Sequence, residues 1–128
     1  MTKEEVNKRN EAIAIFMGGK LSKPKNPINS PYWKIPRHNT YLGNPNKVYI
    51  LYYDRFWDWI MPVIEEIEKP GSIWLVEIGF NACKIFNLMN LNNSTDAEYS
   101  RIGIHKRQAV FLAVSDYCIN YNKKNNEL

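Results

Sequence analysis

Apolar positions near the start of the chain recur with the period of an α-helix. They are Val6, Ile13, Phe16 and Met17. Their spacing is close to 3.6 residues and predicts one narrow stripe that packs against a core. Thr2 and Glu5 have the spacing of a capping box, in which a hydroxyl accepts from the backbone three residues on. Gly18 and Gly19 predict the end of this helix.

Two longer apolar runs predict buried strands. Residues 48–53 are all β-branched, aromatic or aliphatic, and residues 73–78 are interrupted by Glu77. Because neither run alternates between apolar and polar positions, we expect both strands to be covered on both faces. Residues 82–86 follow a turn and predict the returning arm of a hairpin, in which Glu77 pairs with Lys84.

Two further segments have helical periodicity. Residues 54–68 place their apolar positions on one face, although Pro62 removes a backbone donor from the middle of the segment. Asp54 and Asp58 lie at its front, where they are expected to cap the helix and complement its dipole. The last helix is expected over residues 104–123.

The order of elements predicts a single small domain over residues 1–128. Its class is α/β in the broad sense (α+β), because one helical crossover and one hairpin imply a mixed or antiparallel sheet of three or four strands. Strands covered on both faces favour a three-layer α/β/α sandwich. The alternative is a two-layer α+β arrangement with every helix on one face of the sheet.

Residues 20–46 are expected to be an irregular, proline-rich and basic loop. Five of the seven prolines fall here, which excludes regular helix. Tyr32, Trp33 and Ile35 predict a short edge strand between two of these prolines. A loop of this length inside a compact domain is functional, disordered, or held in place by its aromatic side chains.

Charge is distributed unevenly along the chain. The net charge is +4, yet residues 18–53 contain six basic residues and no acidic one. The basic residues are Lys20, Lys23, Lys25, Lys34, Arg37 and Lys47, and the rings interleaved with them are Tyr32, Trp33, His38 and Tyr41. A cationic path with ring faces on which bases stack is typical of single-stranded nucleic-acid binding. The alternative is that the rings only hold the loop against the core.

These patterns give a set of candidate ligand-binding residues. They are Tyr32, Trp33, Lys34, Arg37, His38, Trp57 and Trp59. The two later tryptophans flank Asp58 and, together with Asp54, could form a pocket with aromatic walls. The alternative is that both aspartates serve only the helix N-terminus.

No catalytic or cofactor-binding pattern is found. His38 and His105 have no Cys, Asp or Glu at metal-ligand spacing, so no metal is expected. Cys83 and Cys118 are expected to be buried core residues, and the glycine patterns that hold nucleotide phosphates are missing. We therefore expect no cofactor, and an enzyme ranks below a binding or interaction protein. The start of the chain does not resemble a signal peptide, and no apolar run reaches the roughly 20 residues that cross a bilayer.

Three pieces of the chain resemble a known family. They are residues 15–20, residues 53–68 and residues 117–122. The most specific piece is the W-D-W-[IL]-M-P-V-[IV]-E-x-I-E string, whereas residues 21–46 are unmatched. Together these pieces resemble the phage ABA sandwich domain proteins, which are short phage and prophage proteins of gut bacteria. The resemblance implies an α/β/α sandwich, and it implies no activity. The start of the chain and the lack of a long apolar run predict the cytoplasm, here that of a bacterial host cell.

Several functional hypotheses follow. The first is a non-enzymatic phage or prophage accessory protein that binds through its basic aromatic loop. A specific form of it is a nucleic-acid- or nucleotide-binding protein that neutralises phosphates and stacks bases. The alternative is a structural interaction module, possible as a homo-oligomer, whose contact is formed by Trp57, Trp59 and the Tyr32–Trp33 segment. No membrane partner is expected.

Overall fold

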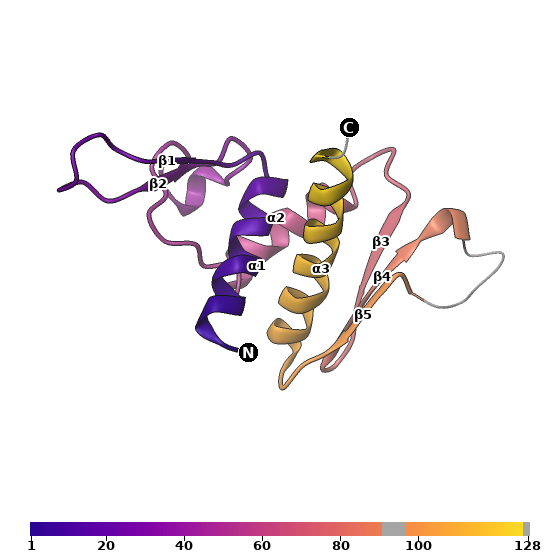
Figure 1. Cartoon of the computed structure of the whole chain (residues 1–128). Helices are drawn as coiled ribbons and strands as arrows, with labels where there is room; N and C mark the ends of the chain where they lie inside the picture. The colour runs from indigo at the N-terminus through magenta and orange to yellow at the C-terminus, as the bar shows by residue number, and fades with distance from the viewer. Residues whose placement is uncertain (91–96, 127–128) are drawn as a thin grey trace.

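The computed structural model describes residues 1–90 and 97–126. This part of the chain has a mixed α+β fold with three α-helices and two small antiparallel sheets. The elements are α1 (Lys3–Phe16), β1 (Lys20–Ser22), β2 (Tyr32–Lys34), η1 (Thr40–Leu42), α2 (Trp57–Ile67), β3 (Trp74–Ile78), β4 (Ala82–Asn87), η2 (Leu88–Asn90), β5 (Tyr99–Ile102) and α3 (Lys106–Asn126). Figure 1 shows the helices lying between the β1–β2 hairpin and the β3–β4–β5 sheet.

Helix α1 begins and ends as its sequence predicts. The Thr2 hydroxyl accepts a hydrogen bond from the amide of Glu5 at 3.1 Å. Gly18 adopts a φ of +84°, which side chains rarely allow. Gly19 follows where a Cβ would lie 2.6 Å from the carbonyl oxygen of Ala14. The two glycines therefore let the chain turn back tightly over the end of the helix.

The larger sheet has the order β3-β4-β5, and its outer face is exposed. Along β3, Trp74 and Val76 pack against the core, whereas Leu75 and Glu77 are exposed. The prediction of a strand covered on both faces is therefore wrong: burial alternates along β3, with apolar Leu75 on the outer face. The predicted hairpin is confirmed, with Glu77 directly opposite Lys84.

In the described part of the chain, the helices lie on one side of this sheet. Helix α3 packs on β4 and β5, α2 contacts β3, and α1 packs against α3 rather than against the sheet (Figure 1). A helical layer on the outer face, as in a three-layer sandwich, is not observed among these residues. The two-layer alternative also has every helix on one face of the sheet, and the described helices agree with it in this respect.

Helix α3 supplies much of the hydrophobic core. The sequence predicts a buried face of Val110, Phe111, Val114, Cys118 and Tyr121. The first four are at most 1% exposed, as predicted, whereas Tyr121 is 44% exposed. The helix begins two residues later than expected and continues to Asn126. This helix lies between α1 and the three-stranded sheet.

The start of α2 differs from its prediction. The helix begins at Trp57, and the preceding residue, Phe56, provides no side-chain cap. Asp54 is not a cap, because its carboxylate accepts a hydrogen bond from the Asn10 amide at 2.9 Å. Asp58 lies in the first turn, where its charge complements the helix dipole as expected.

The predicted strand over residues 48–53 is wrong. Val48 alone forms a bridge, with Trp33, through hydrogen bonds of 2.7 and 2.9 Å. Tyr49 and Ile50 are more than half exposed, whereas Tyr53 is buried in the core. The side chains of this run therefore lie in different places, some at the surface and one in the core, and the backbone does not form a continuous strand. The predicted edge strand is confirmed as β2, while β1 and β5 were not predicted.

A charged cluster joins three elements that are distant in sequence. Arg9 of α1 donates hydrogen bonds of 2.8 Å to the Ser115 hydroxyl and to the Asp116 carboxylate of α3. Arg101 of β5 donates to both oxygens of the same carboxylate. Burial alone would raise the pKa of Asp116, but the hydrogen bonds from Arg101 and Arg9 lower it overall. The carboxylate therefore links α1, α3 and β5 in its charged form.

Candidate functional site

The β1–β2 hairpin gathers basic and aromatic side chains on one face. Lys20 lies directly opposite Lys34, and Ser22 opposite Tyr32. Because alternate residues of a strand share a face, Lys20, Lys34 and Tyr32 are on the same side of the hairpin. The ring of Tyr32 meets that of Tyr49 edge to face, with the centroids 6.0 Å apart. This contact connects the hairpin to the segment that follows Val48.

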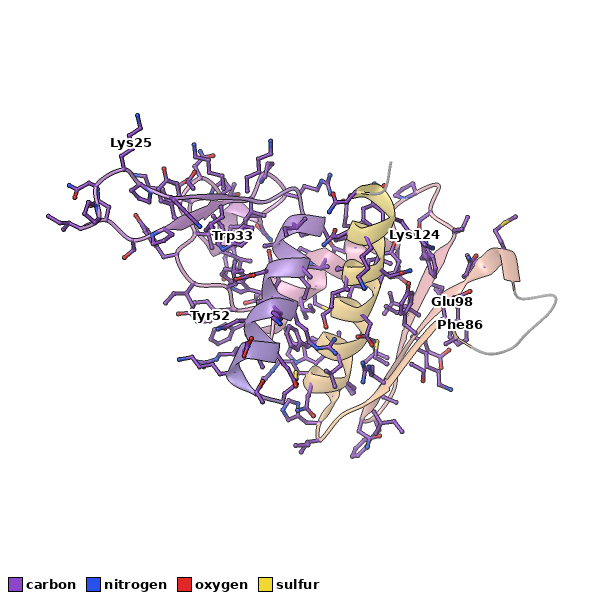
Figure 2. The ribbon with its side chains drawn as sticks, in the orientation of Figure 1. Lys25, Trp33, Tyr52, Phe86, Glu98 and Lys124 are labelled. Atoms are coloured by element: carbon purple, nitrogen blue, oxygen red, sulfur yellow. The ribbon has the colours of Figure 1, made fainter. Side chains whose placement is uncertain are left out.

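Five lysines of this region are exposed and unpaired. They form the lysine cluster, which consists of Lys20, Lys23, Lys25, Lys34 and Lys47. Across residues 1–90 and 97–126, none of the ion pairs includes any of the five. Figure 2 shows Lys25 at the far end of the hairpin, projecting away from the helices. The cluster therefore presents positive charge that no neighbouring carboxylate balances.

Arg37 is committed to contacts inside the protein. Its guanidinium donates a hydrogen bond of 2.8 Å to the carbonyl oxygen of Phe16, at the end of α1. The same nitrogen lies 3.5 Å from the carboxylate of Glu66 in α2. Arg37 therefore holds the end of α1 beside α2, and it differs in this respect from the lysine cluster.

His38 and Trp59 meet in a pocket beside the hairpin. Their ring centroids are 4.7 Å apart at an interplanar angle of 63°. We call this hollow, of about 280 Å³, the His38 pocket. Its lining residues are His38, Leu42, Gly43, Asn44, Lys47, Val48, Tyr49, Ile50, Tyr52 and Trp59. The pocket has aromatic walls with one lysine and one imidazole among them.

The imidazole of His38 is buried without a hydrogen-bond partner in the described part of the chain. The residue is 7% exposed, and its backbone amide donates to the carbonyl of Ile35 at 3.0 Å. No hydrogen bond is made by its ring nitrogens, and neither nitrogen is among the polar atoms sealed from solvent. Burial lowers the pKa of His38, so the ring is neutral at pH 7. A neutral ring with one donor and one acceptor therefore faces the pocket.

The remaining predicted tryptophans lie elsewhere. Trp57 is the first residue of α2 and packs partly buried against the core, outside the His38 pocket. Trp33 lines a neighbouring groove with Tyr49, between α1 and the hairpin. Of the seven predicted residues, His38 and Trp59 are thus brought together in one pocket, and Tyr32 and Lys34 lie on the adjoining hairpin.

The structure adds Tyr49, which sequence reasoning missed, and Lys47, which was counted among the basic residues but not among the candidate ligand-binding residues. Both line the His38 pocket, and both also line a second hollow under the hairpin together with Pro24 and Tyr32. Tyr49 is 57% exposed, so its ring is accessible to a ligand. Its assignment to a buried strand hid it from the prediction. These two residues connect the pocket to the lysine cluster.

Neither cysteine is placed to act as a nucleophile. Cys83 and Cys118 are fully buried, and burial raises the pKa of Cys83 to about 12 and that of Cys118 well above its ordinary value. Their thiols therefore stay protonated and enclosed. Among residues 1–90 and 97–126, no group of three His, Cys, Asp or Glu side chains is placed to hold a metal ion. None of the helices in these ranges combines the length and the apolar character needed to cross a membrane.

Comparison with known proteins adds no relative. No family model matches the chain, and neither a curated protein nor a solved structure matches it. The resemblance to the phage ABA sandwich domain proteins therefore stays a prediction, and functional inference depends on the site itself.

Proposed function

We propose that this protein is a non-enzymatic binding module that holds single-stranded nucleic acid along the β1–β2 hairpin and the segment from Lys47 to Tyr52. The observation that supports it most is the lysine cluster, whose charge is unpaired and lies beside exposed aromatic rings. Phosphates would be neutralised by the lysines, and bases would stack on the rings.

The register of the hairpin favours an anionic ligand. Like charges directly opposite each other on a sheet are destabilising, and Lys20 faces Lys34 in this way. Within the described residues neither lysine has a carboxylate partner that would reduce the repulsion. A phosphate bound between them would do so. Tyr32, on the same face, offers a ring next to the phosphate position.

The proposal is tested by titrating a fluorescent oligothymidylate of about 15 nucleotides at roughly 50 mM and 200 mM salt. We expect the logarithm of the affinity to fall linearly with the logarithm of salt, with a slope of about −2 to −3 for three to four phosphate contacts. Lys34→Ala and Lys47→Ala should each reduce the slope by roughly 0.7. Lys106→Ala, outside the cluster, is the matched control and should leave the slope unchanged. Absence of binding at low salt, or equal slopes in all variants, would reject the proposal.

The phage or prophage origin and the cytoplasmic location belong to the same proposal. They are supported by the W-D-W-I-M-P-V-I-E-E-I-E string, residues 57–68, which forms α2 and its end. A nucleic-acid ligand suits a protein of that setting, because phage proteins work in a cell full of replicating and transcribed strands.

We infer a second candidate function, self-association through the outer face of the β3–β4–β5 sheet, from the residues exposed there. A second copy of the chain would cover this face with its own sheet, so that two sheets pack face to face. The pairs on this face are Leu75 with Phe86 and Glu77 with Lys84. Figure 2 shows Phe86 on the side of the sheet away from α3.

The charges on this face are complementary to themselves. Glu77 and Lys84 form no ion pair within the described residues. A two-fold axis that runs along the strands between β3 and β4 would set Glu77 of each copy over Lys84 of the other. The same rotation would set Leu75 over Phe86, so that apolar groups meet apolar groups.

Sedimentation at rising protein concentration tests this second candidate. The wild-type chain should form a dimer, Glu77→Lys should weaken it by about tenfold, and the double variant Glu77→Lys, Lys84→Glu should restore it. Glu65→Lys, on the exposed face of α2, is the control for a change of charge alone. A wild-type chain that stays monomeric at high concentration contradicts this function and leaves nucleic-acid binding unaffected.

A further inference from the structure

We infer that the His38 pocket receives one nucleobase of the bound strand, whose edge hydrogen-bonds to the imidazole of His38 while the adjoining phosphate lies against Lys47. This inference rests on the proposed nucleic-acid function. It deepens that function, because it adds an enclosed subsite with hydrogen bonds to one base, on a surface that otherwise binds phosphates and stacks bases on exposed rings.

The size of the pocket suits a single flat ring system. Pockets for larger ligands usually measure roughly 300–1,000 Å³, and the His38 pocket measures about 280 Å³. It therefore lies at the lower end, where a nucleobase fits and a large cofactor does not. The pocket is open on one side, as it must be if the base stays attached to its strand.

The ring nitrogens of His38 have no hydrogen-bond partner among the described residues of the protein. They keep some contact with solvent, so a ligand that enters the pocket can take the place of water there. The contact with Trp59 and the hydrogen bond from the His38 amide to Ile35 hold the ring in place. A neutral imidazole offers one donor and one acceptor, and the edges of nucleobases carry both kinds of group. The ring is thus fixed before the ligand arrives.

The walls and the mouth of the pocket supply the other contacts. Tyr52 is held edge to face against Trp59, with the centroids 5.5 Å apart, and it presents a rigid aromatic wall. Tyr49 lines the pocket and also touches Tyr32 of the hairpin. Lys47 is exposed at the same place, where it can reach a phosphate. A strand could therefore pass from the pocket onto the hairpin without leaving the basic surface.

The test compares two oligomers of equal length on the intact protein. One is oligothymidylate, and the other has the same sugar-phosphate backbone with abasic residues throughout. Because stacking of one base changes affinity by roughly 10-fold or more, we expect the oligothymidylate to bind at least about tenfold more tightly at the same salt. His38→Phe should reduce this ratio several-fold and leave the abasic affinity unchanged. His38→Gln, which keeps a donor and an acceptor, should retain more of the ratio.

Two controls separate the possible outcomes. His105→Phe changes an exposed histidine that does not line the pocket and should leave the ratio unchanged. Thermal unfolding of each variant checks that the fold is intact, and His38→Gln serves if His38→Phe does not fold. If both oligomers bind the wild-type protein equally, both the base subsite and the stacking of bases on the rings are wrong, and phosphate binding alone stands. If the ratio is the same in His38→Phe as in the wild type, the bases are bound elsewhere on the surface and the His38 subsite is wrong. If neither binds, both the subsite and the function are rejected.

Discussion

Changing Lys20, Lys34 and Lys47 together to glutamate is expected to lower the affinity for single-stranded oligonucleotide by about 100-fold or more at low salt. The three lysines lie around the hairpin and the His38 pocket, are exposed, and have no carboxylate partner in the described chain. Each phosphate contact contributes through the release of counterions, so the loss of three contacts multiplies. Glutamate adds repulsion to that loss. Fluorescence anisotropy with labelled oligothymidylate measures the change.

A variant of equal charge provides the comparison for this prediction. Changing Lys106, Lys123 and Lys124 to glutamate alters the net charge by the same amount on α3, away from the hairpin (Figure 2). Its affinity should fall by less than about tenfold, through the long-range field alone. If the two triple variants lose affinity equally, binding is a response to net charge and the hairpin is not the interface.

Replacing Asp116 with alanine is expected to lower the free energy of unfolding by about 3 kcal/mol. Breaking a buried ion pair from one side costs roughly 3–5 kcal/mol, and the lower figure applies because the Asp116 side chain remains 22% exposed. The change leaves Arg9, whose side chain is 17% exposed, without its carboxylate partner. It also frees Arg101 from α3. Urea unfolding followed by circular dichroism measures the loss.

The same carboxylate predicts a dependence on pH. The pKa of Asp116 is lower in the folded protein than its ordinary value, so its stabilising effect is complete above that ordinary value. The effect is lost as the pH falls through the lowered pKa. The gap in stability between the wild type and Asp116→Asn should therefore narrow in strong acid. Glu65→Ala, which removes an exposed carboxylate without an ion pair, should change the stability by less than about 0.5 kcal/mol at any pH. A gap that stays constant down to pH 2 contradicts this assignment.

Local signals predicted the elements whose sequence and packing agree. The Thr2 cap, the Gly18 turn and the periodicity of α3 each depend on neighbouring residues, and each is observed. The hairpin of β3 and β4 was predicted because its turn and its Glu77–Lys84 pair are also local. Such features need no knowledge of the rest of the chain.

The errors come from apolar runs whose surroundings are decided by tertiary structure. Residues 48–53 have the composition of a buried strand, but Tyr49 and Ile50 are exposed and Tyr53 turns into the core. An apolar run without alternation has the same sequence pattern in a buried strand as in the wall of a pocket, so the pattern cannot distinguish the two. Leu75 likewise lies on the exposed outer face of β3, although the apolar residues around it predicted a strand that is buried on both faces.

The candidate site was predicted in part for a similar reason. Composition identified the lysines and rings of the hairpin, because charge and residue type can be counted along a sequence. It could not separate Arg37, which binds the carbonyl of Phe16, from Lys47, which is free. The burial of His38 beside Trp59 depends on residues 21 positions apart in the chain, and no local pattern indicates that distance.

The pairing of α1 with α3 has a consequence for synthesis of the protein on the ribosome. Asn122 donates to the carbonyl of Ala12 across 110 positions, and Arg9 reaches Asp116 across 107. The first helix therefore leaves the ribosome without its packing partner. At about 5–20 residues per second, roughly 5–20 s pass before the last helix follows. Until α3 has also left the ribosome, the apolar stripe of α1 lacks the helix that covers it, and this part of the core cannot form.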